Sequence, residues 1–394
     1  MPDAWLRNLE RELDALHEKG RLRSLRMYSG IDFGSNDYLG FAEDRELKEL
    51  AVEALRASAL SSSSSRLLPG HHAEHLAAEK YFANFVGSES ALFFNSGYDA
   101  NMALLTTLPT RHDLILYDER SHASIYDGVH ASLAKSQRFA HNSASDLARH
   151  LERMQAGSAA PRVGQRFQPA QIFVLIESVY SMDGDIAELS ELAIVAEEYG
   201  AIMIVDEAHA TGVLGRHGEG LVKETIGSSS NVLTVHTGGK ALGAAGAFVA
   251  GSKTVVEYLV NKARPFIYTT ALPPIIPLQL MNAVRRLETE GSALVRRLRE
   301  RSVFVRTELQ RSLARWMVPN GIAPIISIII GAEGDALQAS HSLQGMGFDV
   351  PAIRPPTVPE GSARLRLNIS LRHSEEELRG VVEAIVKTEQ EIAR

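Results

Sequence analysis

The 394-residue sequence predicts an α/β protein, in which a large domain with a mostly parallel sheet precedes a smaller α+β domain. Three observations favour this fold. Short, continuous apolar runs recur between residues 91 and 250, as expected for strands buried on both faces. Helical segments of ten or more residues separate several of these runs, which is the pattern of β-α-β units. After Pro273-Pro274 the pattern changes to one long helix followed by shorter elements.

The first 39 residues are expected to form a helix and a segment that pack on the smaller domain. The helix is predicted because apolar residues recur at intervals of three and four, with charged residues between them. These residues are Trp5, Leu6, Leu9, Leu13 and Leu16, and Gly20 ends the pattern.

The large domain is expected to span residues 40–275. Helices are predicted at residues 45–60, 75–85, 100–108 and 187–199, and strands at residues 91–94, 114–117, 172–176, 201–205, 231–235 and 246–250. The serine run from Ser61 to Ser65 is too short for a linker, so we interpret it as a loop. Residues 156–171 are polar and lack periodicity, which predicts a surface loop.

The smaller domain is expected to span residues 276–394. Its long first helix is predicted at residues 277–315. The apolar segment at 323–330, a helix near 335–346, a strand at 363–369 and a closing helix from Glu375 follow, which predicts an α+β domain.

Composition excludes several classes of function. The chain has 41 basic and 48 acidic residues, and the resulting net charge of −7 argues against a nucleic-acid or anionic-membrane partner. It has no cysteine, which excludes disulfides, thiolate metal sites and a cysteine nucleophile, and no metal site is predicted. Neither a signal peptide nor a run of roughly 18 apolar residues is present, so we expect a cytoplasmic protein.

Lys240 is the most informative residue of the chain. It follows Gly238-Gly239 after the apolar run at residues 231–235, and Asp206 and His209 follow the run at 201–205. A lysine near glycines is most often a solvated loop residue. A lysine among small residues that is paired with such an acid also suits pyridoxal phosphate (PLP). The lysine forms a Schiff base with the cofactor aldehyde, and the acid keeps the pyridine nitrogen protonated.

A candidate phosphate site lies between the strand at 91–94 and the helix at 100–108. The turn Asn95-Ser96-Gly97-Tyr98 connects them, and the free N–H groups at a helix N-terminus suit a phosphate. Most such turns only change the direction of the chain, since helix N-termini are common. The hydroxyl of Thr237, three residues before Lys240, could meet the same phosphate.

His122 and Ser181 also follow predicted strands. A structural histidine and an ordinary turn serine are the default interpretations. Ligands of parallel sheets bind beyond the carboxyl ends of strands, so His122 could instead stack on a planar cofactor. Ser181 could bond the phenolic oxygen of that ring, and His209 would lie near the same oxygen.

Two arginines lie on one face of the strand at 363–369, because Arg364 and Arg366 are two residues apart. Arginines on a strand are more often part of a solvated edge. In an enzyme that acts on amino acids, a guanidinium group is a natural partner for the substrate carboxylate.

Together these segments resemble the α-oxoamine synthases, fold-type I PLP enzymes that condense an amino acid with an acyl thioester and release carbon dioxide. The matching segments are Asn36-Asp37-Tyr38-Leu39-Gly40, Ser121-His122, Ser181-Met182-Asp183-Gly184, Asp206-Glu207-Ala208-His209, Thr237-Gly238-Gly239-Lys240 and residues 356–367. The resemblance spans nearly the whole chain in order and spacing. It implies an acyltransferase with a seven-stranded sheet that works as a homodimer with active sites at the subunit interface.

The resemblance also implies roles for individual residues. Lys240 would carry the cofactor, His122 would stack on its ring, Asp206 would meet its nitrogen, and His209 and Ser181 would approach its phenolic oxygen. The phosphate would be held by Gly97, Tyr98 and Thr237, with Thr269 or Thr270 reaching the phosphate of the neighbouring subunit. The substrate would be bound by Asn36, Arg354 and Arg366, of which Arg366 would hold the amino-acid carboxylate.

Within the family, the segments at 138–142, 352–359 and 363–367 are most similar to the biotin-pathway branch, which condenses L-alanine with a pimeloyl thioester. The branches that join glycine to acetyl-CoA or serine to a long acyl thioester share most of the same motifs. Whether the acyl group is carried by coenzyme A or by an acyl carrier protein stays open. A non-catalytic partner subunit would be expected to lack Lys240, and a dinucleotide-binding oxidoreductase needs a glycine fingerprint that is not found in the right context.

The sequence departs from the family in two places. The family usually has a glycine-rich turn before its Ser-Arg pair, whereas this chain has Ser61-Ser62-Ser63-Ser64-Ser65-Arg66. Glycine permits backbone conformations that serine does not, so the shape of the acyl-binding side is open. The residue before Gly239 is often bulkier in relatives, and here it is Gly238.

Overall fold

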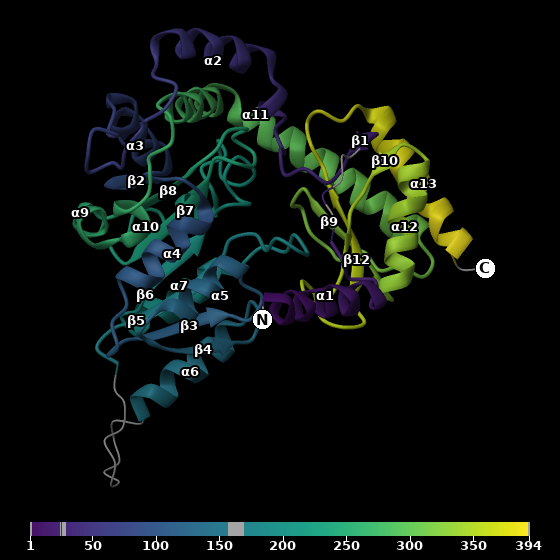
Figure 1. The fold of residues 1–394 in the computed structure, drawn as a ribbon, viewed down its shortest axis with the longest axis horizontal. Helices are drawn as coiled ribbons and strands as arrows, with labels where there is room; N and C mark the ends of the chain where they lie inside the picture. Colours follow the sequence, from purple (N-terminus) through teal and green to yellow (C-terminus); the bar gives the residue numbers. More distant parts are fainter. Residues whose placement is uncertain (1, 24, 26–28, 157–168, 393–394) are drawn as a thin grey trace.

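The computed structural model describes residues 2–23, 25, 29–156 and 169–392. Its largest sheet has seven strands in the order β2-β8-β7-β6-β5-β3-β4 (Figure 1). The strands are β2 (Ser90–Phe94), β3 (Leu114–Asp118), β4 (Lys135–Phe139), β5 (Ile172–Glu177), β6 (Ile202–Asp206), β7 (Val232–Thr237) and β8 (Ala247–Gly251). The five strands from β7 to β4 run parallel, and β8 is antiparallel to both β2 and β7. The predicted fold class, α/β with a mostly parallel sheet, is therefore confirmed.

Helices cover both faces of this sheet, which explains its continuous apolar strands. In β3, Ile115 packs into the core on one face, and Leu114 and Leu116 pack into the core on the other. The first core includes side chains of α4 (Gly97–Thr107), α5 (Ala123–Ala131), α9 (Lys253–Lys262) and α10 (Arg264–Ile267). The second includes side chains of α6 (Ala144–Ala156), α7 (Leu189–Glu198) and α8 (Leu221–Thr225). Burial on both faces is what a parallel sheet requires.

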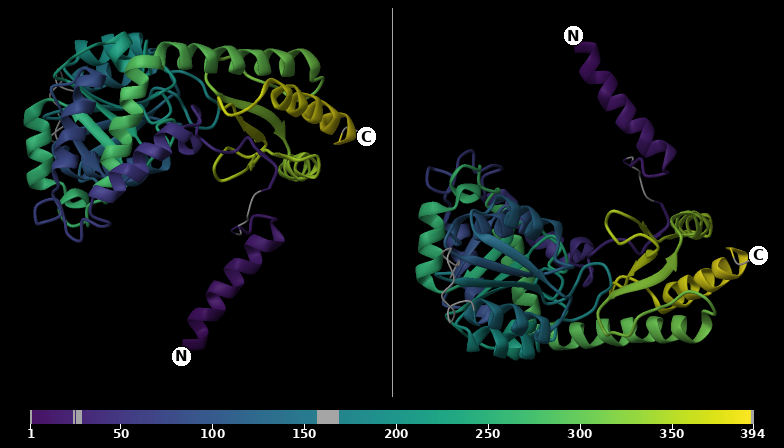
Figure 2. Two further views of the ribbon diagram at one scale, coloured as in Figure 1. Left: turned by 90° about the horizontal axis from the view of Figure 1, so that it is seen from above. Right: turned by 90° about the horizontal axis from the view of Figure 1, so that it is seen from below.

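A second body is built on the antiparallel sheet β11-β12-β9. Its strands are β9 (Ile325–Gly331), β11 (Ala352–Ile353) and β12 (Ala363–Asn368), and its helices are α12 (Glu333–Gly345) and α13 (Glu375–Ile392). The long helix α11 (Ile275–Ser312) runs from the large sheet to this body (Figures 1 and 2). Along its length, α11 contacts α3 (Ala73–Val86), α13 and β9.

The N-terminal segment joins the smaller body through a short strand pair. β1 (Ile31–Asp32) pairs in parallel with β10 (Phe348–Asp349). Helix α1 (Pro2–Glu18) projects from the rest of the molecule (Figure 2), whereas η1 (Phe41–Glu43) and α2 (Arg45–Ala57) lead into the large body. The domain boundaries at residues 39 and 275 stay predictions.

The sequence did not predict β4, because four of its five residues are exposed and its sequence is polar. Helices α5 and α6 were not predicted either. Most of the loop predicted at residues 156–171 lies outside the described residues. No helix in the described ranges is both long and apolar enough to cross a membrane. The cytoplasmic location stays a prediction.

Candidate active site

The candidate site is located where neighbouring parallel strands end. Asp118 ends β3, Glu177 ends β5, Asp206 ends β6 and Thr237 ends β7. Glu177 and Asp206 are register partners in adjacent strands. Because the carboxyl ends of parallel strands share one edge of the sheet, these side chains converge there, as in other open α/β sheets that bind ligands at that edge.

Lys240 lies in a tight loop just beyond β7. Gly238 closes this loop by donating to the Gly246 carbonyl at 2.8 Å and accepting from Ala244 N at 2.9 Å. Burial lowers the pKa of the Lys240 amine to about 8, against the opposing effect of the Asp206 and Glu177 carboxyl groups. Within the described ranges, no hydrogen bond or ion pair engages this amine. A partly buried amine with a lowered pKa is suited to act as a nucleophile or base.

The position of Gly238 has little room for a side chain. A Cβ at this position would lie 2.5 Å from the Ala245 carbonyl oxygen and 2.6 Å from Leu280 Cδ2. The first of these atoms belongs to the backbone and cannot rotate away. Glycine is therefore the residue that this loop accommodates without a shift.

Asp206 is buried and held from two sides. Its Oδ1 accepts from Ala208 N at 2.9 Å, and its Oδ2 accepts from Asn101 Nδ2 at 2.8 Å. Asn101 comes from α4 and also donates to Ser124 Oγ at 3.0 Å. Asn101 was not among the predicted site residues. The available signal was its position four residues after Gly97, which places both residues on one face of the helix.

His122 caps the N-terminus of α5 and is open to solvent. Its backbone N–H donates to the Glu177 carboxyl group. Its Nδ1 accepts from Ser124 N at 3.2 Å and lies 2.8 Å from Ser124 Oγ. The imidazole is thus fixed at one edge while a face stays accessible, which suits the predicted stacking role.

His209 is buried beyond β6, and its Nδ1 lies 2.7 Å from the Tyr38 hydroxyl. Burial, together with the positive charges of Lys240 and Arg366, lowers the pKa of His209 well below its usual range. His209 is therefore neutral at physiological pH.

The turn at the start of α4 brings Gly97 next to Thr237. A Cβ built on Gly97 would lie 3.7 Å from Thr237 Cβ. Ser96 caps the helix by accepting from Asp99 N at 3.0 Å. The N–H groups of Gly97 and Tyr98, which also belong to the first turn, have no hydrogen bond among the described residues. Tyr98 is 44% exposed and donates to Asp127 at 2.6 Å.

Thr269 and Thr270 lie against this turn within one chain. Asn95 Nδ2 donates to Thr269 Oγ1 at 3.0 Å and to the Thr270 carbonyl at 2.9 Å. The reach of these threonines to a second subunit stays a prediction.

Arg366 connects three parts of the chain. It is buried, its Nε donates to the Ser181 carbonyl at 2.6 Å, and its Nη2 donates to Asn36 Oδ1 at 3.1 Å. The Tyr38 hydroxyl also lies beside this guanidinium group. Apart from it, Nη1 meets no acceptor among the described residues, so this nitrogen is available for a carboxylate. The Ser181 hydroxyl likewise has no hydrogen bond in the described part of the chain. Arg364 instead pairs with Asp183.

Arg354 contacts a different part of the molecule. It donates to the Gly20 carbonyl and lines a groove of about 810 Å³ between the N-terminal segment and residues 352–357. Among the described residues, no contact links Arg354 to Lys240 or Arg366. Its substrate-binding role stays a prediction.

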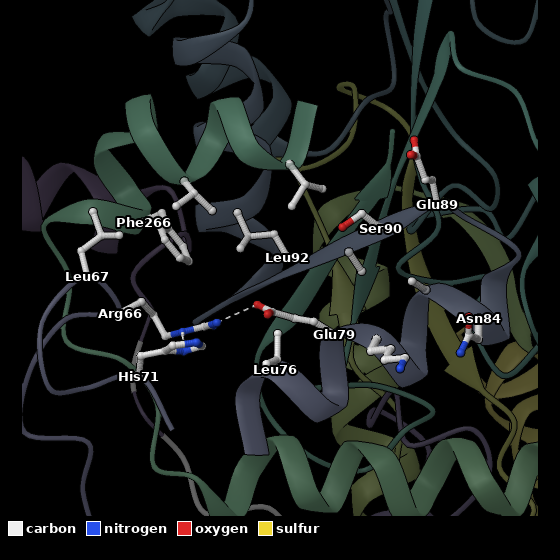
Figure 3. A pocket seen from close by; sticks show the side chains of 15 residues that line it. Arg66, Leu67, His71, Leu76, Glu79, Asn84, Glu89, Ser90, Leu92 and Phe266 are labelled. Carbon is white, nitrogen blue, oxygen red and sulfur yellow. Dashed lines mark hydrogen bonds and ion pairs between the residues drawn. The ribbon is translucent and has the colours of Figure 1, made fainter. Parts of the chain in front are cut away.

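The pocket in Figure 3 is separate from these residues. It lies between α3, the edge strand β2 and α9, and has a volume of about 470 Å³. Arg66 and Glu79 form an ion pair of 2.9 Å in it. None of the predicted site residues is among its described lining residues.

The residues at the strand ends fit PLP. The cofactor needs an amine for its aldehyde, a carboxylate for its ring nitrogen and N–H donors for its phosphate. Lys240 provides an amine without a partner in the described ranges, Asp206 provides a carboxylate that Asn101 orients, and the Gly97 turn beside Thr237 provides the donors. The set is therefore that of a PLP-dependent enzyme.

Comparison with known proteins assigns the family. The aminotransferase class I and II family matches residues 28–385. An 8-amino-7-oxononanoate synthase of Chromobacterium violaceum is 39% identical over 386 residues, covering 95% of this chain and 96% of its own. A serine palmitoyltransferase of Sphingomonas wittichii has a similar structure, with a TM-score of 0.86 at 29% identity over 98% of this chain and 97% of its own. The structure of an 8-amino-7-oxononanoate synthase from Francisella tularensis gives a TM-score of 0.76 at 30% identity, covering 93% and 99% of the two chains.

The chain belongs to the aminotransferase class I and II family and, within it, to the α-oxoamine synthases, as its motifs predicted. Its cofactor is pyridoxal phosphate, and the chain is an acyltransferase.

Proposed function

We propose that this protein condenses L-alanine with a pimeloyl thioester to give 8-amino-7-oxononanoate, carbon dioxide and the free thiol, a step of biotin biosynthesis. The observation that carries the proposal is the Lys240 amine, which has no hydrogen-bond partner in the described ranges and lies at the strand edge that bears Asp206. The name of the relative from Chromobacterium violaceum, which is 39% identical over nearly the whole chain, supports the choice of this reaction.

Each residue has a defined task in this proposal. When PLP is bound, it supplies an electron sink for the negative charge that develops on the substrate α-carbon. Asp206 holds the ring nitrogen, and Asn101 and Ala208 keep its carboxylate in place. Lys240 Nζ removes the α-proton, which a pKa of about 8 allows near neutral pH.

Arg366 and His122 orient the reactants. The free Nη1 of Arg366 binds the amino-acid carboxylate, while its other nitrogens stay fixed on Ser181 and Asn36. His122 covers the cofactor ring, and Gly97, Tyr98 and Thr237 hold the phosphate. We further propose a homodimer in which Thr269 or Thr270 reaches the phosphate of the neighbouring subunit.

A second reaction of the same family is favoured by the structural likeness to a serine palmitoyltransferase. In this alternative, the chain joins serine to a long acyl thioester. The serine run at residues 61–65 contacts the segment that follows Thr270, because Ser62 Oγ donates to the Leu272 carbonyl at 2.7 Å and Ser64 O accepts from Ala271 N at 3.0 Å.

The PLP-loaded protein is mixed with one acyl donor (pimeloyl-CoA, palmitoyl-CoA or pimeloyl-acyl carrier protein) and one amino acid at a time, and thiol release is followed. Release from pimeloyl-CoA with L-alanine, but not with glycine or L-serine, is the expected result. Release with serine and palmitoyl-CoA alone would transfer the assignment to the second reaction. Thiol release with pimeloyl-acyl carrier protein and L-alanine, without release from pimeloyl-CoA, would identify the carrier protein as the acyl donor.

A further inference from the structure

Tyr38 lies between two residues of the candidate site. Its hydroxyl oxygen is 2.7 Å from His209 Nδ1 and 3.1 Å from Asn36 Oδ1. Its side chain is fully buried. Tyr38 belongs to the segment between β1 and η1, whereas His209 belongs to the loop after β6, so the contact joins parts of the chain that are far apart in sequence.

The orientation of the Asn36 amide is determined by its other neighbours. Asn36 Oδ1 lies 3.1 Å from Arg366 Nη2 and 3.2 Å from Asn368 Nδ2. Arginine nitrogens can only donate. Asn368 Nδ2 faces the Gly34 and Ser35 carbonyl oxygens at 2.9 and 3.0 Å, and these can only accept, so this atom is an NH2 group. The Asn36 atom that faces both donors is therefore its oxygen.

This orientation decides where the single hydroxyl proton of Tyr38 lies. Burial raises the pKa of Tyr38 to about 12, so the proton is present at neutral pH. Asn36 Oδ1 cannot donate, so a hydrogen bond between Tyr38 and Asn36 requires the tyrosine proton. The tyrosine oxygen then accepts from His209 Nδ1–H. The Arg366 guanidinium, which can only donate, also lies beside the tyrosine oxygen. With the tyrosine proton directed to Asn36, the contacts with Asn36 and His209 are both hydrogen bonds, whereas a proton directed to His209 would leave the 3.1 Å contact between Tyr38 and Asn36 without a proton.

We propose that Tyr38 is a positioning residue that holds His209 in the tautomer protonated at Nδ1, so that Nε2 faces the cofactor and substrate as a hydrogen-bond acceptor. In histidines generally, a hydrogen bond at one ring nitrogen fixes which of the two nitrogens carries the proton. The statement that Nε2 faces the cofactor and substrate rests on the proposed function. The placement of the proton on Nδ1 rests only on the hydrogen bonds of Tyr38 with Asn36 and His209.

The same contacts couple substrate binding to His209. Arg366, which is expected to bind the amino-acid carboxylate, donates to Asn36, and Asn36 accepts from Tyr38. The chain of hydrogen bonds from Arg366 to His209 is continuous and crosses from the smaller body to the large one. A hydroxyl group that bonds to Nε2 would have to donate its own proton.

The first test reads the tautomer directly. Holoenzyme is labelled with 15N-histidine and studied by 15N NMR, and the His209→Asn variant identifies the signals of His209 among those of the 14 histidines. The expected spectrum has a protonated Nδ1 and an unprotonated Nε2 near neutral pH, and Tyr38→Phe is expected to lose this preference. Protonation at Nε2 in the wild type, or an unchanged tautomer in Tyr38→Phe, would overturn the proposal.

The second test compares two tyrosine variants. Tyr38→Phe keeps the buried ring and is expected to lower kcat about 10- to 100-fold, the range found when the partner that orients a metal-binding histidine is removed. KM for L-alanine is expected to change little, because Arg366 keeps its bond to Ser181. Tyr81→Phe is the matched control, since its hydroxyl donates to Glu288 on the distant contact between α3 and α11. Wild-type kcat in Tyr38→Phe would contradict the positioning role.

The two tests separate this proposal from the proposed function. If the wild-type protein did not react L-alanine with pimeloyl-CoA, the proposed function would be wrong, and the NMR measurement would still decide the tautomer of His209. Circular dichroism and the cofactor absorption band confirm that each variant is folded and loaded.

Discussion

Asn101 Nδ2 lies 2.8 Å from Asp206 Oδ2, and this contact ties helix α4 to the end of β6. Because α4 also begins with the Gly97 turn, one helix orients both the carboxylate for the cofactor ring and the donors for its phosphate. The two ends of the proposed cofactor site are thus held by a single rigid element.

Replacing Asn101 is expected to weaken cofactor binding. Asn101→Ala removes a buried hydrogen bond to a carboxylate, and such bonds contribute about 1.5–3 kcal/mol. The dissociation constant of PLP, measured by absorbance titration, is expected to rise on the order of tenfold to a hundredfold. Asn84→Ala, at an exposed position of α3, is the control. Equal PLP affinity in Asn101→Ala and wild type would show that Asp206 does not need this support.

The Lys240 amine is expected to react with small amine reagents at a lower pH than exposed lysines. Its pKa of about 8 means that a large fraction is unprotonated above pH 8. Reductive methylation of the cofactor-free protein at a series of pH values, read by peptide mass spectrometry, gives the titration of each lysine. Lys253, whose side chain is 68% exposed, is the internal reference. Identical pH profiles for the two lysines would contradict the effect of burial.

Arg366→Lys is expected to weaken the binding of the amino acid. Lysine keeps the charge but cannot hold Ser181, Asn36 and a carboxylate at once, because it lacks the planar fork of arginine. We expect KM for L-alanine to rise on the order of tenfold or more, as for a lost charge-assisted hydrogen bond. KM for the acyl thioester is expected to change much less. Arg296→Lys, on the exposed side of α11, is the control. An unchanged KM for L-alanine would show that Arg366 does not bind the amino-acid carboxylate.

His141 is expected to stabilise the fold at acidic and neutral pH. Burial alone would lower its pKa, but hydrogen bonds to Asp118 at 2.9 Å and Asp185 at 2.7 Å raise the pKa of His141 to about 9. A histidine whose folded pKa exceeds its unfolded value of about 6.5 contributes stability that is full below pH 6.5 and is lost as the pH rises through 9. The contribution is on the order of 3 kcal/mol.

Urea unfolding of wild type and His141→Gln over a range of pH checks this stability effect. The difference between their unfolding midpoints is expected to be largest at or below pH 6.5 and to shrink as the pH approaches 10. The exposed His112→Gln is expected to show no such trend. A difference between the two unfolding midpoints that grew with pH would contradict this prediction.

The sequence predicted the site residues that lie at strand ends better than those that support them. Lys240, Asp206, His209 and His122 follow apolar runs that form buried strands, so their convergence at one edge follows from a parallel sheet. Asn101 and Tyr38 were not predicted as partners of Asp206 and His209. Their contacts depend on how α4 and the N-terminal segment pack on the strand ends, and this packing leaves no periodic signal in the sequence.

The missed elements have a similar origin. Strand β4 occupies the edge of the sheet, where exposed, polar residues replace the apolar run on which the prediction depended. Gly238 had no explanation until its close approach to the Ala245 carbonyl was visible. The position of β4 in the sheet and the close packing of the loop around Gly238 are both set by the folded structure and not by local propensity.

The attachment of the cofactor to Lys240 is the central claim, and borohydride reduction tests it most directly. The holoenzyme is reduced, digested and analysed by peptide mass spectrometry for a phosphopyridoxyl group. We expect this group on Lys240 in the wild type and no modification at that peptide in Lys240→Ala. A phosphopyridoxyl group on another lysine, or no modification of the wild-type protein, would contradict the account.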